Sequence, residues 1–146
     1  MERFKIDHFL KSHPGGSFPN FETLGHQDTL AIRSRLAQRL GLAPDASYRE
    51  LQDRIVSFQI QGATFRQEVM NQSLTSIKIP LDIELSSQVL IDWSSQSNID
   101  RLKWDDFTER FHDIWYPSSE DIDVFDESLS WIMSVSHDGV LCLVKL

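Results

Sequence analysis

The spacing of apolar residues changes near Asn71, and this change limits the folds open to the chain. Before Asn71, apolar side chains recur every three or four positions, as Leu51, Ile55 and Phe58 do. This period is typical of helices with one buried face. Over residues 77–85 apolar residues instead alternate strictly with polar residues or proline, as in a half-buried strand. A helical first half followed by a sheet is therefore predicted.

Three helices are predicted in the first half. One covers residues 1–11, and a second covers Asp28–Gly41, with its first residue as the N-cap. The third begins at Ser47 and Glu50, whose spacing fits a capping box in which each side chain accepts from the other residue's backbone amide. Gly62 weakens this helix, which is expected to continue after a bend through Phe65, Val69 and Met70.

The second half is predicted to form strands with one helix between them. Pro80 lacks an amide donor, so the strand at 77–85 is expected at a sheet edge, with Val89–Trp93 as a possible hairpin partner. A helix is expected over Trp104–Tyr116. Asp138-Gly139 lies between two apolar alternations and predicts a hairpin with a type I′ turn. The fold class is α+β: a helical N-terminal half, then an antiparallel sheet with an inserted helix and a C-terminal β-hairpin.

Length and composition predict a single domain over residues 1–146. The chain is 40% hydrophobic and 25% charged, which is ordinary for a globular protein able to fold without metal or disulfide. Cys142 is the only cysteine, so no intrachain disulfide can form, as suits a reducing cytosol. The first residues lack the apolar core of a signal peptide, and no apolar run reaches membrane-spanning length. A cytoplasmic protein with no membrane association is expected.

Negative charge is concentrated at the C-terminal end of the sequence. Residues 111–146 hold seven carboxylates and one lysine, whereas residues 1–110 hold fifteen acidic and thirteen basic residues. An acidic segment that also carries aromatic residues suits a basic protein partner and is poorly suited to nucleic acid. The charge pattern therefore predicts protein binding.

Motifs for catalysis are sparse. Two His-Asp pairs, His112-Asp113 and His137-Asp138, keep open a small metal-dependent hydrolase as an alternative, although other ligands at metal-binding spacing are missing from the sequence. Cys142 lies between two leucines, as a packed and inert thiol would. No phosphate-binding glycine loop or nucleophile elbow is present in the sequence. No catalytic residue, metal ligand or cofactor is predicted.

The segment from Trp104 to the C-terminus resembles part of a known class of proteins. It combines a WYPSSED-type loop at residues 115–121 with a following strand, Trp131 and the His137-Asp138-Gly139 turn. In these features it resembles the C-terminal part of small acidic bacterial immunity proteins, which are partners of polymorphic or contact-delivered toxins. The resemblance implies a protein without a cofactor that neutralises a cognate toxin domain by binding it, often over the toxin's active site.

The predicted partner-binding site lies in the acidic segment. Trp115 and Tyr116 would be the buried anchors of the interface, and five carboxylates would steer association with a basic partner: Glu120, Asp121, Asp123, Asp126 and Glu127. The alternative is that Trp115 fills the core and the carboxylates keep the protein soluble. A dimeric secretion chaperone of similar size, acidity and α+β content is a second alternative. The sequence leaves the oligomeric state open.

Overall fold

The computed structural model describes residues 1–62, 65–77, 86–93 and 98–146. Its centre is a seven-stranded, wholly antiparallel sheet in the order β1-β4-β3-β5-β6-β7-β2. The strands are β1 (Phe21–Thr23), β2 (Phe65–Glu68), β3 (Gln88–Trp93), β4 (Ile99–Lys103), β5 (Ile122–Phe125), β6 (Trp131–Val135) and β7 (Val140–Lys145). The α+β prediction is confirmed. The strand predicted at 77–85 lies outside the described residues from position 78 onward. Its predicted hairpin partner, Val89–Trp93, belongs to β3, whose two neighbours are instead β4 and β5, so the predicted pairing is wrong.

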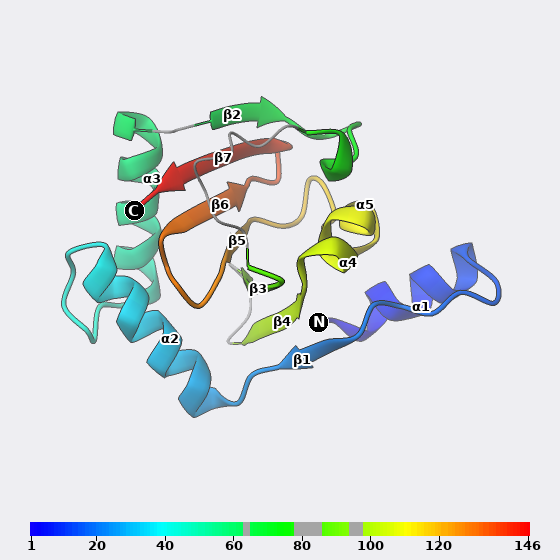
Figure 1. The fold of residues 1–146 in the computed structure, drawn as a ribbon, viewed down its shortest axis with the longest axis horizontal. Helices are drawn as coiled ribbons and strands as arrows, with labels where there is room; N and C mark the ends of the chain where they lie inside the picture. The colour runs from blue at the N-terminus through cyan, green and yellow to red at the C-terminus, as the bar shows by residue number, and fades with distance from the viewer. Residues whose placement is uncertain (63–64, 78–85, 94–97) are drawn as a thin grey trace.

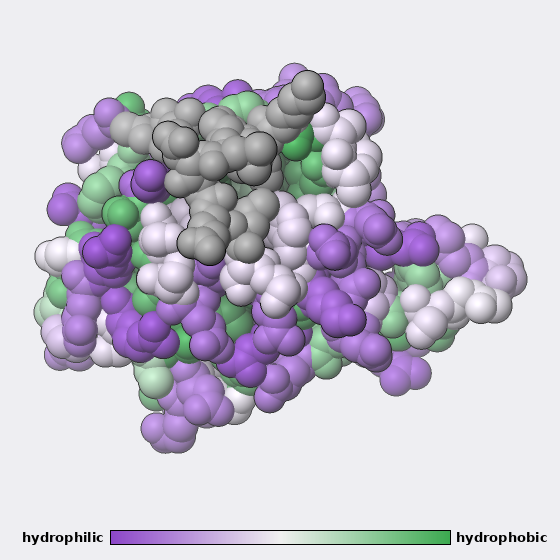
Figure 2. All heavy atoms as spheres, viewed as in Figure 1, coloured by the Kyte–Doolittle hydropathy of each residue, from purple (hydrophilic) through white to green (hydrophobic). Residues whose placement is uncertain are grey.

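Helices cover both faces of the sheet (Figure 1). The helices are α1 (Arg3–Ser12), α2 (His26–Arg39), α3 (Tyr48–Gly62), the 3-10 helix η1 (Leu74–Ser76), α4 (Trp104–Glu109) and α5 (Phe111–Ile114). On one face α2 and α3 bury Leu36 and Ile55 against Phe125. On the other face α4 and α5 bury Phe107 and Ile114 with a second apolar cluster. The outer surface in the same view is mainly hydrophilic, with small separate apolar areas (Figure 2).

The N-terminal helices follow the local signals closely. Ser47 N donates to Glu50 Oε2 at 2.7 Å, and Glu50 N donates to Ser47 Oγ at 3.3 Å, so the capping box is confirmed. Helix α2 starts slightly earlier than predicted, because Gly25 is the N-cap residue and Asp28 lies in the first turn. A carboxylate there still interacts favourably with the helix dipole.

The predicted continuation of the third helix is wrong. Phe65–Glu68 forms the edge strand β2, which pairs with β7, and Val69 N donates to Gly139 O at 2.8 Å. These backbone bonds place the segment on the sheet, and Val69 becomes fully buried there. Pairing with a strand that is distant in the sequence thus overrides the helical spacing of apolar residues, which involved only a few positions.

The predicted helix at 104–116 is two short helices. The backbone at Arg110 has φ −111° and ψ 22°, which separates α4 from α5. The acidic run that follows is not a solvated loop throughout, because Ile122–Phe125 forms β5 between β3 and β6. A strand with neighbours on both edges and helices on both faces is enclosed, and all four residues of β5 are buried.

The C-terminal hairpin is confirmed, with a different turn from the one predicted. Strands β6 and β7 pair in register from Trp131 with Lys145 to Val135 with Leu141. Gly139 has φ +77°, but Asp138 is not among the described residues with positive φ, so the turn is not type I′. Gly139 N donates to Ser136 O at 2.8 Å, closing a turn in which only the glycine needs the left-handed conformation.

Candidate partner-binding site

Trp115, the predicted anchor, belongs to the core. Its side chain is fully buried, and its ring stacks on Phe111 with the ring centres 5.1 Å apart. Its indole nitrogen donates to Glu120 O at 2.9 Å. The alternative in which Trp115 fills the core is therefore the one that the structure supports.

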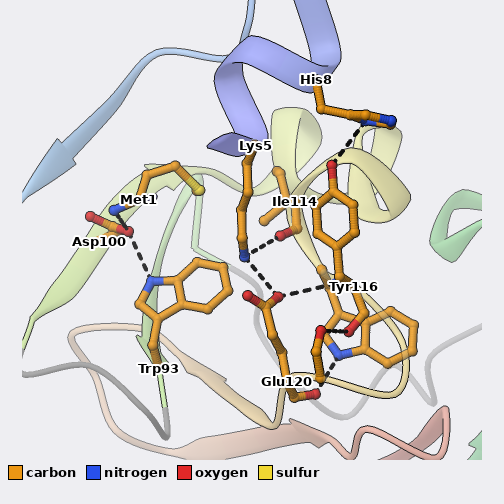
Figure 3. A network of polar contacts seen from close by, with 10 residues as sticks. Met1, Lys5, His8, Trp93, Asp100, Ile114, Tyr116 and Glu120 are labelled. Carbon is orange, nitrogen blue, oxygen red and sulfur yellow. Dashed lines mark hydrogen bonds and ion pairs between the residues drawn. The ribbon is translucent and has the colours of Figure 1, made fainter. Parts of the chain in front are cut away.

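Glu120 is also buried, where it forms an ion pair with a lysine from the far end of the chain (Figure 3). Lys5 Nζ lies 2.7 Å from Glu120 Oε2 and donates to Ile114 O at 2.7 Å. The same nitrogen is 3.7 Å from the centre of the Trp93 ring. Burial lowers the pKa of Lys5, and Glu120 acts against that shift. This pair attaches α1 to the loop that precedes β5 and is not available to a partner.

Tyr116 is half-buried and faces α1. Its hydroxyl is 3.1 Å from His8 Nδ1, and its backbone amide donates to Glu120 Oε2 at 3.1 Å (Figure 3). Nearby, Asp100 accepts from the Trp93 indole at 2.8 Å and contacts the Met1 amino group. Sequence reasoning missed Lys5 and Asp100, because their roles depend on partners distant in the chain.

Asp126 and Glu127 occupy contrasting environments. Asp126 is buried at the end of β5, where it accepts from Ser128 N at 3.0 Å and from the Trp131 indole at 3.3 Å. It therefore shapes the β5–β6 turn. Glu127 is exposed and pairs with Arg101 at 2.8 Å.

The last two predicted contact residues, Asp121 and Asp123, lie together at a pocket of about 350 Å³ between α3 and the sheet. It is lined by α3, β2, the loop before β5, β5, β6, β7 and the β6–β7 turn: Gln52, Ile55, Val56, Gln59, Arg66, Asp121, Ile122, Asp123, Ser134, Val135, Ser136, His137, Asp138, Val140 and Cys142. Of the seven predicted residues, the structure brings only these two to one cavity. Asp138 joins them from the hairpin turn.

The rim of the pocket carries exposed charge. Asp121 Oδ1 accepts from His137 N at 2.7 Å and lies 2.9 Å from His137 Nδ1. The hydrogen bond between the His137 ring and Asp121 is the main cause that raises the pKa of His137, and the negative charge of Asp121 raises it further. The Asp138 side chain is 78% exposed. Arg66 is the exposed basic residue of the lining.

Asp123 forms part of the pocket's inner wall and is buried. Gln52 Nε2 donates to its Oδ2 at 2.5 Å, and Ser134 Oγ donates to its Oδ1. On the neighbouring strand Asp92 lies directly opposite, where Arg33 binds it through two nitrogens at 2.9 and 2.6 Å. Burial raises the pKa of Asp123 to about 6.

Apolar side chains on α3 flank this charged rim. Val56 lines the pocket and is 47% exposed, and Ile60, one turn further along α3, is 78% exposed. Protein interfaces combine an apolar centre with a polar rim, and exposed aliphatic residues beside charged ones are compatible with that arrangement. Neither residue carried a signal in the sequence beyond its place on a helix.

The two His-Asp pairs do not meet in the described structure. His112 lies on α5, 2.9 Å from Gln72 O and packed against the rings of Phe111 and Trp115, whereas His137 pairs with Asp121. Ser134 donates to Asp123 and not to a histidine. Within the described ranges, no group of three or more His, Cys, Asp or Glu side chains could hold a metal ion.

No helix within the described residues is long and apolar enough to cross a membrane. Comparison of the chain with protein-family models, curated proteins and solved structures gave no match.

Proposed function

We propose that this chain is a protein-binding module: a cytoplasmic bacterial immunity protein that neutralises a cognate toxin domain by binding it. The contact surface, here called the pocket face, consists of the pocket between α3 and the sheet, its rim residues Asp121 and Asp138, and the exposed Val56 and Ile60 of α3. The single observation that carries this proposal is that the exposed Val56 lines one cavity together with Asp121 and Asp138, with the exposed Ile60 one turn further along α3.

The pocket face combines the two contributions that a protein interface needs. Burial of Val56 and Ile60 against a partner would remove apolar surface from water, at about 25 cal/mol for each Å². Asp121 and Asp138 would attract a basic partner and raise its association rate. A toxin domain that acts on nucleic acid needs a basic cleft for phosphates, and such a cleft complements this surface. In this proposal the apolar contact residues of the interface are Val56 and Ile60, in place of the predicted anchors Trp115 and Tyr116.

Co-expression tests the proposal in cells. The chain is produced together with the protein encoded by the neighbouring gene, and growth is followed. We expect protection by the wild-type chain and loss of protection when Asp121→Lys and Asp138→Lys reverse the rim charge. The matched control reverses two acidic residues on α4, Asp105→Lys and Glu109→Lys, and should still protect.

Equal protection by both variants would remove the pocket face from the interface. A neighbouring protein that is not toxic, or that is toxic and unaffected by the wild-type chain, would contradict the immunity role itself.

A further inference from the structure

Five carboxylates are buried among the described residues, and they differ in how their charge is balanced. Glu120 pairs with Lys5, Asp92 with Arg33 and Asp100 with the Met1 amino group, whereas Asp126 accepts from Ser128 and from the Trp131 indole. Asp123 is equally enclosed, but its two described hydrogen-bond donors, the Gln52 amide and the Ser134 hydroxyl, are neutral. Across residues 1–62, 65–77, 86–93 and 98–146, no lysine, arginine or histidine forms an ion pair with Asp123. A buried carboxylate without a countercharge destabilises the fold that holds it.

Asp123 is the one of these five buried carboxylates that lines the pocket between α3 and the sheet. The pocket beside it measures about 350 Å³, near the lower end of the roughly 300–1,000 Å³ range of ligand pockets. Ile55 and Val56 supply an apolar wall, while Asp121 and Asp138 add charge at the rim. Against these three carboxylates the lining offers Arg66 and His137, and His137 already pairs with Asp121. The pocket is therefore net negative, with its most enclosed charge at the inner wall.

We propose that this pocket receives one basic side chain of the partner, an arginine or a lysine, whose cationic group pairs with the Asp123 carboxylate. The inference rests on the proposed function and names the contact at its centre. The aliphatic stem of such a side chain would lie against Ile55 and Val56, as basic residues commonly bury their stems along apolar surface. The cation would supply the countercharge that Glu120 and Asp92 obtain from within the chain.

The raised pKa of Asp123 is consistent with a missing countercharge. Burial is its main cause, and the charges of Asp92 and Asp121 add to it. The other titratable groups near this carboxylate or in the pocket lining are Tyr48, Arg66, His137, Asp138 and Cys142. A cation bound at the carboxylate would lower the pKa again, because it favours the ionised form.

Small organic cations test the pocket without the partner. The uniformly labelled full chain is titrated with n-butylammonium and with n-propylguanidinium at pH 7, and backbone and carboxyl resonances are followed by NMR. We expect saturable shifts centred on Ser134 and His137, with the pKa of Asp123 lowered by about one unit. Neutral n-butanol, which shares only the apolar stem, should bind about tenfold more weakly. The cation that binds more tightly shows whether the pocket prefers lysine-like or arginine-like groups.

Two variants and a control assign the site. Asp123→Asn should weaken cation binding at least about tenfold, whereas Asp126→Asn, a change at a buried carboxylate outside the pocket, should leave it unchanged. Val56→Lys places a cation from the chain itself at the half-exposed pocket wall and should also abolish probe binding. This second variant keeps the test decisive if Asp123→Asn alters the fold.

Equal binding of n-butanol and the cations, or shifts that do not involve Ser134 and His137, would overturn the inference. Because the probes need no partner, this failure can be separated from failure of the proposed function. If the rim variants lose protection but the probes do not bind, the pocket face remains the interface. The inference that a side chain of the partner enters the pocket would then be wrong.

Discussion

Burial divides five of the seven carboxylates of the acidic segment into two groups with different roles. Glu120, Asp123 and Asp126 are buried and hydrogen-bonded within the chain. Asp121 and Asp138 are exposed at the pocket rim. Changing a member of the first group alters stability, because its partners lose an acceptor in a region of low dielectric. Changing a member of the second group alters mainly association, because exposed charges contribute little to stability.

Asp123→Asn should stabilise the free protein at neutral pH. A carboxyl whose pKa in the folded state lies near 6, above its unfolded value, binds a proton more tightly when folded. Its contribution to stability is therefore greatest at low pH and is lost as pH rises from about 4 through 6. Asparagine has no charge to bury, so the variant should gain roughly 1–2 kcal/mol over the wild type at pH 8 and little at pH 4. Urea unfolding of both proteins across this pH range measures the difference. If the free energy of unfolding of the variant relative to wild type is lower at pH 8 than at pH 4, the raised pKa of Asp123 is contradicted.

Trp115→Ala should destabilise the fold strongly. The side chain is fully buried, stacks on Phe111 and donates to Glu120 O. Truncation of an enclosed tryptophan leaves a cavity and typically costs about 3–5 kcal/mol. Chemical denaturation checks this loss. A variant as stable as wild type that dissociates faster from its partner would return Trp115 to the interface.

At the scale of elements, local signals succeeded where one short stretch of sequence decides the structure. The capping box at Ser47 and Glu50, and the glycine that turns the C-terminal hairpin, act over a few residues. The bounds and pairing of strands β2 and β5 could not be predicted in the same way. Strand β2 depends on pairing with β7, and β5 buries a carboxylate that needs Gln52 and Ser134, residues remote in sequence.

Helix α1 is held to the loop before β5 by the pair between Lys5 and Glu120, so Lys5→Ala should release it. The change leaves Glu120 buried and unpaired, which typically costs about 3–5 kcal/mol. The double variant Lys5→Met with Glu120→Gln removes both charges and should recover much of that loss. Thermal unfolding measures each variant. Additive losses in the double variant would show that the two side chains do not interact.

The β6–β7 turn depends on Gly139, and Gly139→Val should lower stability by about 1–3 kcal/mol. The residue has φ +77°, which a β-branched side chain resists. A Cβ at this position would also lie 3.1 Å from the Cβ of Met70. The midpoint of thermal unfolding reports the effect, with Gly15→Val as the control for positive φ without crowding, since that glycine has open space around it.

At the scale of the whole molecule, the pocket face is assembled from segments that the sequence keeps apart. Gln52 and Val56 come from α3, Asp123 from β5, and His137 from the hairpin turn. Charge distribution identified the acidic segment as the region of interest and included Asp121 and Asp123. It could not say which carboxylates point outward, because that depends on tertiary partners such as Lys5, more than a hundred residues from Glu120.

The central claim is that the pocket face binds a basic partner, and association kinetics test it most directly. The association rate with the protein encoded by the neighbouring gene is measured at low and high ionic strength for wild type, for Asp121→Asn with Asp138→Asn, and for the α4 control Asp105→Asn with Glu109→Gln. We predict that wild type and control associate about tenfold or more faster at low salt, and that the rim variant is slower with a flatter salt dependence. Association that is independent of salt, or equally affected by both variants, would contradict the claim.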